Sequence, residues 1–166
     1  RMGGEMDNNP SPGNKRGGLT TILEKSLGAV AKGGTAPLTE VYKFAEPIDK
    51  RGFVFMDSPG YDPCSVTGQV ASGANLIVFT TGRGSVSGYK PVPCIKVATN
   101  SEMYARMSED MDINCGDIVS EGVSLEVKGR EIFESFIATA SGEKTKSEEL
   151  GFGGAEFVPW AMGAVM

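Results

Sequence analysis

Two continuous apolar segments, each about as long as one strand, constrain the fold of this chain most. "GFVFM" occupies residues 52–56 and "NLIVFT" occupies residues 75–80. Unbroken apolar runs are typical of strands buried on both faces of a parallel sheet. Between them, Asp62 followed by Pro63 favours a helix start. We therefore predict a β-α-β unit in one parallel sheet, with a right-handed crossover and "CIKVAT" (94–99) as a weaker third strand.

Two further helices are predicted from amphipathic patterns, which makes the chain an α/β protein. In the segment 21–34, Thr21 and Glu24 have the spacing of a capping box, and Gly33 with Gly34 can end the helix. The segment 125–141 is expected to start after a serine cap and to stop at a glycine. Its apolar face would contain Ile132, Phe133, Phe136, Ile137 and Ala140.

The composition excludes several classes of function. The chain has 166 residues, 40% hydrophobic and 22% charged, which suits a single globular domain. Its net charge of −5 argues against nucleic acid as a partner, and no apolar run is long enough to span a membrane. The three cysteines form no Cys-x-x-Cys pair, and their odd number fits a reducing cytoplasm. The absence of histidine excludes Ser-His-Asp and Cys-His catalysis within this chain.

Polar, tightly turning segments follow each predicted strand. In an open parallel sheet these segments lie at one edge, where loop amides and helix N-termini attract anionic ligands. The same residue types also serve as ordinary turn and cap residues, and that alternative stays open. The residues expected at this edge are Asp57, Ser58, Thr80, Thr81, Arg83, Ser85, Thr99 and Asn100.

The glycine-rich loop in "VFTTGRGSVSG" (78–88) does not fit a nucleotide-binding motif. Its glycines are spaced G-x-G-x-x-x-G, no Walker lysine follows, and Pro91 prevents a helix from opening there. A better fit is an anion pocket in which Arg83 makes bidentate hydrogen bonds to a carboxylate. A structural ion pair of Arg83 with a nearby acid is the alternative.

The acidic segment "EDMDINCGD" (109–117) is a candidate metal site. Asp110, Asp112 and Asn114 alternate, so they would share one side of an extended chain and offer oxygen ligands to Mg²⁺, Mn²⁺, Ca²⁺ or Fe²⁺. Cys115 adds a soft ligand or a reactive thiol. The segment lacks the EF-hand spacing, and by spacing alone a solvated acidic turn is favoured.

The family signal of this chain lies in five stretches. They are "DNNPSPGNKRGGLTTILEKSLGAVAKGG", "FMDSPGYDPCSVTGQVASGANLIVFTTGRGS", "DMDINCG", "ATASGEKTKSEELG" and "EFVPWAMGAVM". Together they resemble the C-terminal region of one enzyme family, the altronate and galactarate dehydratases, which includes the sulfolactate sulfo-lyase large subunit as a relative. The resemblance covers nearly the whole chain and implies that the chain is part of a longer protein. It also implies a Rossmann-like three-layer domain over residues 19–166, with residues 1–18 as a loop or truncated edge.

The resemblance also implies a reaction, the metal-dependent elimination of water from a sugar acid to give a 2-keto-3-deoxy acid. The implied metal is Fe²⁺ or Mn²⁺, with Mg²⁺ or Ca²⁺ as substitutes in a crystal, and its candidate ligands are Asp110, Asp112 and Cys115. The candidate catalytic residues are Glu24, Lys25 and Cys115, while the identity of the base stays open. The candidate substrate-binding residues are Thr67, Thr80, Thr81, Gly82, Arg83, Gly84, Ser85 and Asn100.

The expected partners are a small sugar-acid substrate and the rest of the parent chain, with a homodimer as a further option. Neither nucleic acid nor a membrane is expected, and the expected location is the cytoplasm. Two alternatives remain. The substrate could be sulfolactate, with sulfite as the leaving group, or the isolated chain could be a non-catalytic structural domain. We expect the isolated fragment to be inactive.

Overall fold

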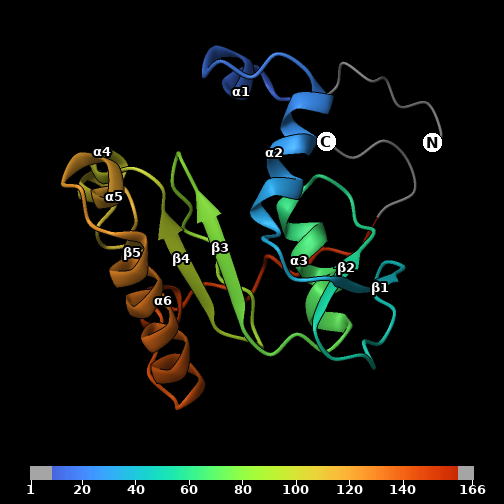
Figure 1. The fold of residues 1–166 in the computed structure, drawn as a ribbon. Coiled ribbons are helices and arrows are strands. Elements are labelled where there is room, and N and C mark those ends of the chain that lie inside the picture. The colour runs from blue at the N-terminus through green and yellow to red at the C-terminus, as the bar shows by residue number, and fades with distance from the viewer. Residues whose placement is uncertain (1–8, 161–166) are drawn as a thin grey trace. The chain divides into compact units, whose positions relative to one another are not determined.

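The computed structural model describes residues 9–160, which form two compact units (Figure 1). The first unit comprises the described residues of Arg1–Gly73 and Pro159–Met166, and the second comprises Ala74–Val158. Helices and parallel strands occur in both units, so the predicted α/β class is confirmed. The predicted boundary at residue 18 stays a prediction. Within the described part of the chain, no helix is both long and apolar enough to cross a membrane.

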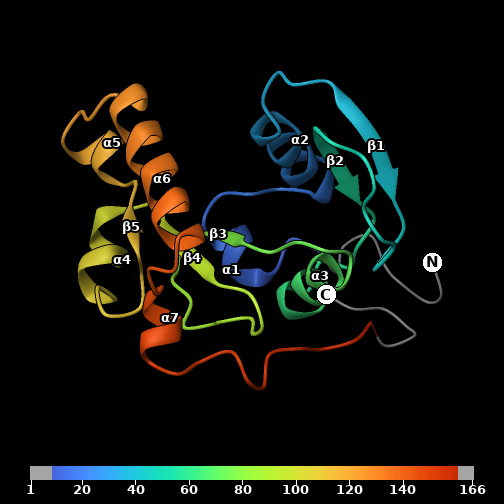
Figure 2. The same ribbon diagram turned by 90° about the horizontal axis from the view of Figure 1, so that it is seen from below.

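The first unit contains three helices and a sheet of two parallel strands (Figure 2). The strands pair with Val41 opposite Phe55 and Tyr42 opposite Met56. Close to the chain's end, the ring of Trp160 packs edge-to-face on Phe44 with 5.1 Å between ring centroids, so this residue returns to the first unit. The elements are α1 (Pro12–Arg16), α2 (Ile22–Lys32), β1 (Leu38–Tyr42), β2 (Phe53–Met56) and α3 (Asp62–Ala71).

The second unit contains a three-stranded parallel sheet in the order β3-β4-β5, accompanied by four helices. Its central strand, β4, has neighbours on both sides, with Ile77 opposite Cys94 and Val97 opposite Ile113. The elements are β3 (Ile77–Thr81), β4 (Cys94–Ala98), α4 (Ser101–Arg106), β5 (Ile113–Asn114), α5 (Asp117–Ser120), α6 (Leu125–Ala140) and α7 (Lys146–Glu149).

The predicted β-α-β unit is wrong in its pairing, although its three elements exist. β2 pairs with β1, whereas β3 pairs with β4, so the two strongest apolar runs lie in different sheets. Helix α3 connects them and carries Pro63 in its first turn, as predicted. The pairing went wrong because β1 was not anticipated, and that strand takes the place beside β2.

The two apolar runs that contain β2 and β3 were predicted to be buried on both faces, and this is also wrong. Every residue of β4 is buried, while β2 alternates between exposed and half-buried positions and β3 has only Ile77 buried. The reason is the position of each strand in its sheet. Ile95 and Val97 of β4 pack under Ile132 and Phe136, which project from helix α6.

The other face of β4 is closed by methionines. Ala98 packs with Met103 of α4 and with Met111, and both methionine side chains are buried. The strand with the weakest apolar signal is therefore the core strand of the second unit, because it is covered on both faces and paired on both edges.

The ends of α6 agree with the sequence. Ser124 caps the helix by accepting a hydrogen bond from the Val127 amide at 3.3 Å, as serine commonly does at a helix start. Gly142 follows the helix with a φ of 107°, a left-handed conformation that suits glycine. The predicted apolar face of α6 is only partly buried, since Phe133 and Ile137 are exposed while Ile132 and Phe136 contact the core.

The start of α2 was predicted half correctly. Thr21 caps the helix and accepts from the Glu24 amide at 3.2 Å, as expected. The carboxylate of Glu24, however, accepts from the amide and hydroxyl of Thr20, at 2.7 and 2.5 Å, rather than from Thr21. The capping box is therefore incomplete, because the Glu24 carboxylate binds the residue before the N-cap instead of the N-cap amide. The helix buries none of its side chains.

Candidate functional site

The loops that follow β3 and β4 meet at the carboxyl edge of the second sheet. Thr81 lies opposite Ala98, and the Thr99 amide donates to the Thr81 carbonyl at 3.0 Å. Asn100 joins the two loops, because its Nδ2 donates to the Gly82 carbonyl at 2.7 Å. Its Oδ1 accepts from the Met103 amide at 2.8 Å and caps α4. The expected convergence is confirmed for these two loops, and both ends of the Asn100 amide hold it. For Asp57 and Ser58 it is wrong, because they follow β2, which belongs to the other sheet.

The loop around Arg83 is held in place by a threonine and a glycine. The hydroxyl of Thr81 accepts from the amides of Arg83 at 3.3 Å and Gly84 at 3.2 Å. Gly84 has a φ of 98°, and a Cβ at this position would collide with the sulfur of Met107. Only glycine therefore lets the loop lie this close to Met107 in that backbone conformation.

The side chain of Arg83 is free to bind a ligand. It is exposed, and within residues 9–160 its guanidinium makes neither a hydrogen bond nor an ion pair. A structural ion pair, the alternative raised by the sequence, is therefore absent from the described part of the chain. A fixed backbone below an unpaired guanidinium suits a planar anion such as a carboxylate.

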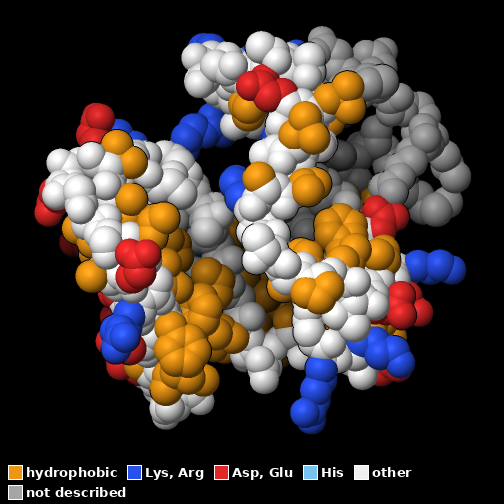
Figure 3. Space-filling model, viewed as in Figure 1, with side chains coloured by type: hydrophobic (Ala, Val, Ile, Leu, Met, Phe, Trp, Pro, Cys, Tyr) orange, Lys and Arg blue, Asp and Glu red, His pale blue; other side chains and the backbone are white. Residues whose placement is uncertain are grey.

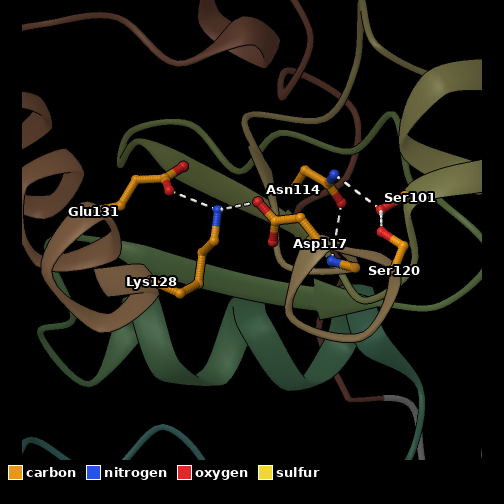
Figure 4. Close-up of polar contacts among 7 residues, drawn as sticks. Ser101, Asn114, Asp117, Ser120, Lys128 and Glu131 are labelled. Atoms are coloured by element: carbon orange, nitrogen blue, oxygen red, sulfur yellow. Dashed lines mark hydrogen bonds and ion pairs between the residues drawn. The ribbon is translucent and has the colours of Figure 1, made fainter. Parts of the chain in front are cut away.

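The end of β5 is locked to the same edge. Asn114 accepts from the Gly116 amide at 2.9 Å and donates to the Ser101 hydroxyl at 3.1 Å, while Ser101 lies 2.9 Å from the Ser120 hydroxyl (Figure 4). A Cβ on Gly116 would collide with the backbone of Asn100 and Ser101. The carboxyl ends of all three strands thus form one connected network.

Beside this network lies an ion cluster that the sequence did not reveal. The ammonium of Lys128 donates to Asp117 at 2.7 Å and to Glu131 at 2.6 Å, and its side chain is 5% exposed (Figure 4). Burial alone would lower the pKa of Lys128, but the hydrogen bonds to both carboxylates outweigh it, so its pKa is raised. The lysine lies in an amphipathic helix pattern, which gave no sign that it would be buried.

Cys115 lies close to this cluster and carries a thiol of raised pKa. Burial is the main cause, and the nearby cation of Lys128 only partly offsets it. A raised pKa keeps the thiol protonated, which opposes its use as a thiolate nucleophile or metal ligand in this arrangement. The catalytic and metal roles of Cys115 stay predictions.

The carboxylate of Asp112 is engaged by the backbone through both oxygens. One oxygen accepts from the Lys96 amide at 2.6 Å and the other from the Lys146 amide at 2.9 Å, so Asp112 ties β4 to the start of α7. In the described ranges, no three Cys, Asp or Glu side chains are placed to hold a metal ion together. Asp110, Asp112 and Cys115 therefore do not fit a complete metal site by themselves.

A second buried lysine lies on β4 and was also missed. Lys96 has no exposed surface, and its ammonium has no hydrogen-bond partner among the residues that are described. Burial lowers the pKa of Lys96, with only partial compensation from the charge of Asp112. Its position inside the apolar run "CIKVAT" was the signal available in the sequence.

The remaining candidates are divided between the two units. Glu24 and Lys25 lie on α2 in the first unit, where Lys25 donates to the side-chain oxygens of Asn9 at 2.8 Å and Asn14 at 3.2 Å. Thr67 is buried in α3 and donates to the Pro63 carbonyl at 2.7 Å. In the second unit, Ser85 accepts from the Ser87 amide at 3.2 Å, and Thr80 is an exposed residue of β3.

In open α/β sheets, the loops at the carboxyl ends of parallel strands are a common place for ligands. Comparison with known proteins identifies the family. The sequence profile described as "D-galactarate/Altronate dehydratase, C-terminal" matches residues 1–165, so the chain belongs to this family.

Individual relatives agree with this assignment. The chain is 43% identical over 144 residues to "Galactarate dehydratase (L-threo-forming)" of Escherichia coli (strain K12), across 86% of the chain and 28% of the relative. It is 39% identical over 144 residues to "Altronate dehydratase" of Bacillus subtilis (strain 168), across 87% of the chain and 29% of the relative.

A further relative carries a different name. The chain is 36% identical over 146 residues to "(2R)-sulfolactate sulfo-lyase subunit beta" of Chromohalobacter salexigens, across 87% of the chain and 38% of that subunit. The chain thus spans less than a third of the two dehydratases and just over a third of the sulfo-lyase subunit.

Proposed function

We propose that this chain is the C-terminal part of a hydro-lyase that eliminates water from a sugar acid such as galactarate or altronate. The family assignment and the names of the relatives support the reaction class. The observation that carries the role of this chain is the unpaired guanidinium of Arg83 on a loop anchored by Thr81 and Asn100. In this proposal, Arg83 binds the substrate carboxylate through two parallel hydrogen bonds.

The proposed elimination proceeds by loss of a proton from the carbon next to that carboxylate. Hydroxide leaves the following carbon, and the resulting enol becomes the 2-keto-3-deoxy acid. Negative charge builds on the carboxylate as the proton leaves, so a guanidinium held against it stabilises the transition state more than the ground state. Thr80, Thr81, Ser85 and Asn100 remain the proposed partners of substrate hydroxyls. Thr67 belongs to the first unit, and its role in binding stays a prediction.

The base and the metal are proposed to come largely from the rest of a longer protein. Fe²⁺ or Mn²⁺ remains the proposed ion, and it would supply Lewis acidity when bound. Among residues 9–160, the Cys, Asp and Glu side chains do not make a complete metal site. Metal analysis of the purified full-length protein tests this part. The three cysteines are free, which agrees with the proposed cytoplasmic setting.

The role of Arg83 is tested in the full-length enzyme. We expect Arg83→Ala to reduce kcat/KM for the sugar acid by about 10²–10³-fold, as for loss of one charge-stabilising donor, with Arg83→Lys intermediate. Unfolding should be unchanged, because the side chain is exposed and makes no hydrogen bond or ion pair within residues 9–160. Arg130→Ala, at an exposed arginine of α6, is the control. Near wild-type kinetics for Arg83→Ala would overturn the proposed role.

The sulfo-lyase relative supports a second candidate substrate, sulfolactate. In both reactions the proton leaves the carbon next to a carboxylate and the leaving group departs from the carbon after it, so Arg83 would act in the same way. Assays for sulfite release and for 2-keto acid formation from sugar acids distinguish the two. We expect the isolated 166-residue chain to be inactive with either substrate.

A further inference from the structure

The first unit carries an apolar surface formed by α2 and the sheet β1–β2. Figure 3 shows hydrophobic side chains gathered over α2 and over the strands below it. The two elements adjoin, since the ring of Phe53 lies 3.1 Å from where a Cβ on Gly33 would stand. We call this the α2–sheet surface. Its residues are 40–75% exposed, and they are Leu23, Leu27, Val30, Leu38, Val41, Phe53 and Phe55.

This surface is physically incomplete. Parallel strands are found almost only in sheets covered on both faces, and two strands alone are marginally stable in water. Both strands of this sheet also have an edge whose backbone groups are paired to no strand in the described ranges, and such edges readily accept another strand. Helix α2 has 11 residues and buries none of them, although a helix of that length depends on packing for most of its stability.

The sheet of the second unit provides the contrast. Its central strand β4 is buried throughout, because α6 covers one face and methionines cover the other. In its edge strand β3, Val78 is 39% exposed, and other exposed apolar residues of that unit, such as Val119 at 89%, lie on helices and loops. Neither strand of the β1–β2 sheet is buried in this way, so that sheet lacks the cover that β4 has.

The length of the relatives indicates the occupant. The segments that match this chain make up 28% and 29% of the two dehydratases, so most of each relative lies outside the match. We propose that the α2–sheet surface is the docking site for the catalytic portion of the same longer polypeptide, whose own strand extends the β1–β2 sheet. The inference rests on the proposed function only in taking this chain to work within a longer protein. It does not depend on the reaction or on Arg83.

The test uses the full-length protein with p-benzoylphenylalanine, a photo-crosslinking residue, placed at Leu27 or at Phe55. Both side chains are exposed, so the substitutions should not disturb folding. The control places the same residue at Val119. Mixing ¹⁵N-labelled and unlabelled protein before irradiation separates crosslinks within one molecule from those between two, and mass spectrometry identifies the joined peptides.

We expect Leu27 and Phe55, but not Val119, to crosslink within one molecule to peptides N-terminal to this chain. Crosslinks to residues 74–158 would instead mean that the second unit covers the surface, and crosslinks between molecules would mean a second copy. Either outcome, or no crosslinks above the Val119 control, would overturn the proposal.

A second measurement tests how strongly the α2–sheet surface is protected from a thiol reagent. In the native full-length protein, the cysteine of Leu27→Cys should react with a maleimide about tenfold or more slowly than that of Val119→Cys, because covered sites react only after local opening. The two should react equally in urea. Equal rates in the native protein would contradict the docking proposal. Turnover measured on the same samples reports separately on the proposed function, since neither Leu27 nor Val119 belongs to the loop that carries Arg83.

Discussion

The two parallel sheets of this protein have similar apolar sequences but different environments. In β1–β2, Tyr42 is buried and Val54 and Met56 are half-buried, but the other apolar side chains are exposed, and Phe55 is 56% exposed. In β3–β4–β5, the central strand is completely buried, and Ile95 is 1% exposed. The difference shows that an unbroken apolar run predicts a strand, but it does not predict which strands pair with it in the sheet. Burial depends on what pairs with the strand and what covers its faces.

The largest expected effect compares core truncations in the two sheets. We expect Ile95→Ala to lower the free energy of unfolding by about 3–4 kcal/mol, because it removes a filled core position between β4 and α6. Phe55→Ala should cost less than about 1 kcal/mol in the same chain, since more than half of this side chain is already in water. Urea unfolding of both variants measures the difference, and similar losses would show that the sheets are equally buried.

A second, smaller effect examines how tightly the carboxyl edge of the second sheet is held. Gly116→Ala should cost about 2–3 kcal/mol, because its new methyl group meets the backbone of Asn100 and Ser101. Gly129→Ala is the matched control, at a helical glycine of α6 with open space around it. It should stabilise the protein by about 0.5–1 kcal/mol. Thermal unfolding with opposite signs for the two changes is the expected result.

The smallest effect concerns the ion cluster beside that edge. Lys128→Met should cost about 1–2 kcal/mol near neutral pH, because it leaves the carboxylate of Asp117 without its cation. Lys144→Met should change stability by less than about 0.5 kcal/mol, because this lysine is exposed. Chemical denaturation of both variants tests the comparison.

The cost of Lys128→Met should also depend on pH. The pKa of Lys128 is raised in the folded state above the ordinary lysine value of 10.5. Its contribution is therefore fully present below that ordinary value and is lost as pH rises through the folded value. The stability difference from the wild type should be constant at neutral and mildly alkaline pH and shrink above 10.5. A difference that grew with alkaline pH would contradict the raised pKa.

The candidate site could be predicted from the sequence in part. The glycines around Arg83 and the polar residues after β4 were recognised, because strand ends and turn residues follow local rules. The structure brings Thr81, Arg83 and Asn100 together as expected. Asp112 was expected as a metal ligand, but its carboxylate is engaged by two distant amides, those of Lys96 and Lys146. Such long-range contacts leave no local pattern.

The sequence by itself determined the α/β class, several helix ends and the family. These depend on local propensity, on capping chemistry and on motifs that lie close together along the chain. Only the tertiary structure decided that β2 pairs with β1, that β4 is the core strand, and that Lys96 and Lys128 are buried. Strand pairing and burial depend on contacts between residues far apart in sequence. One apolar segment is compatible with more than one strand pairing, so its sequence alone does not select the partner.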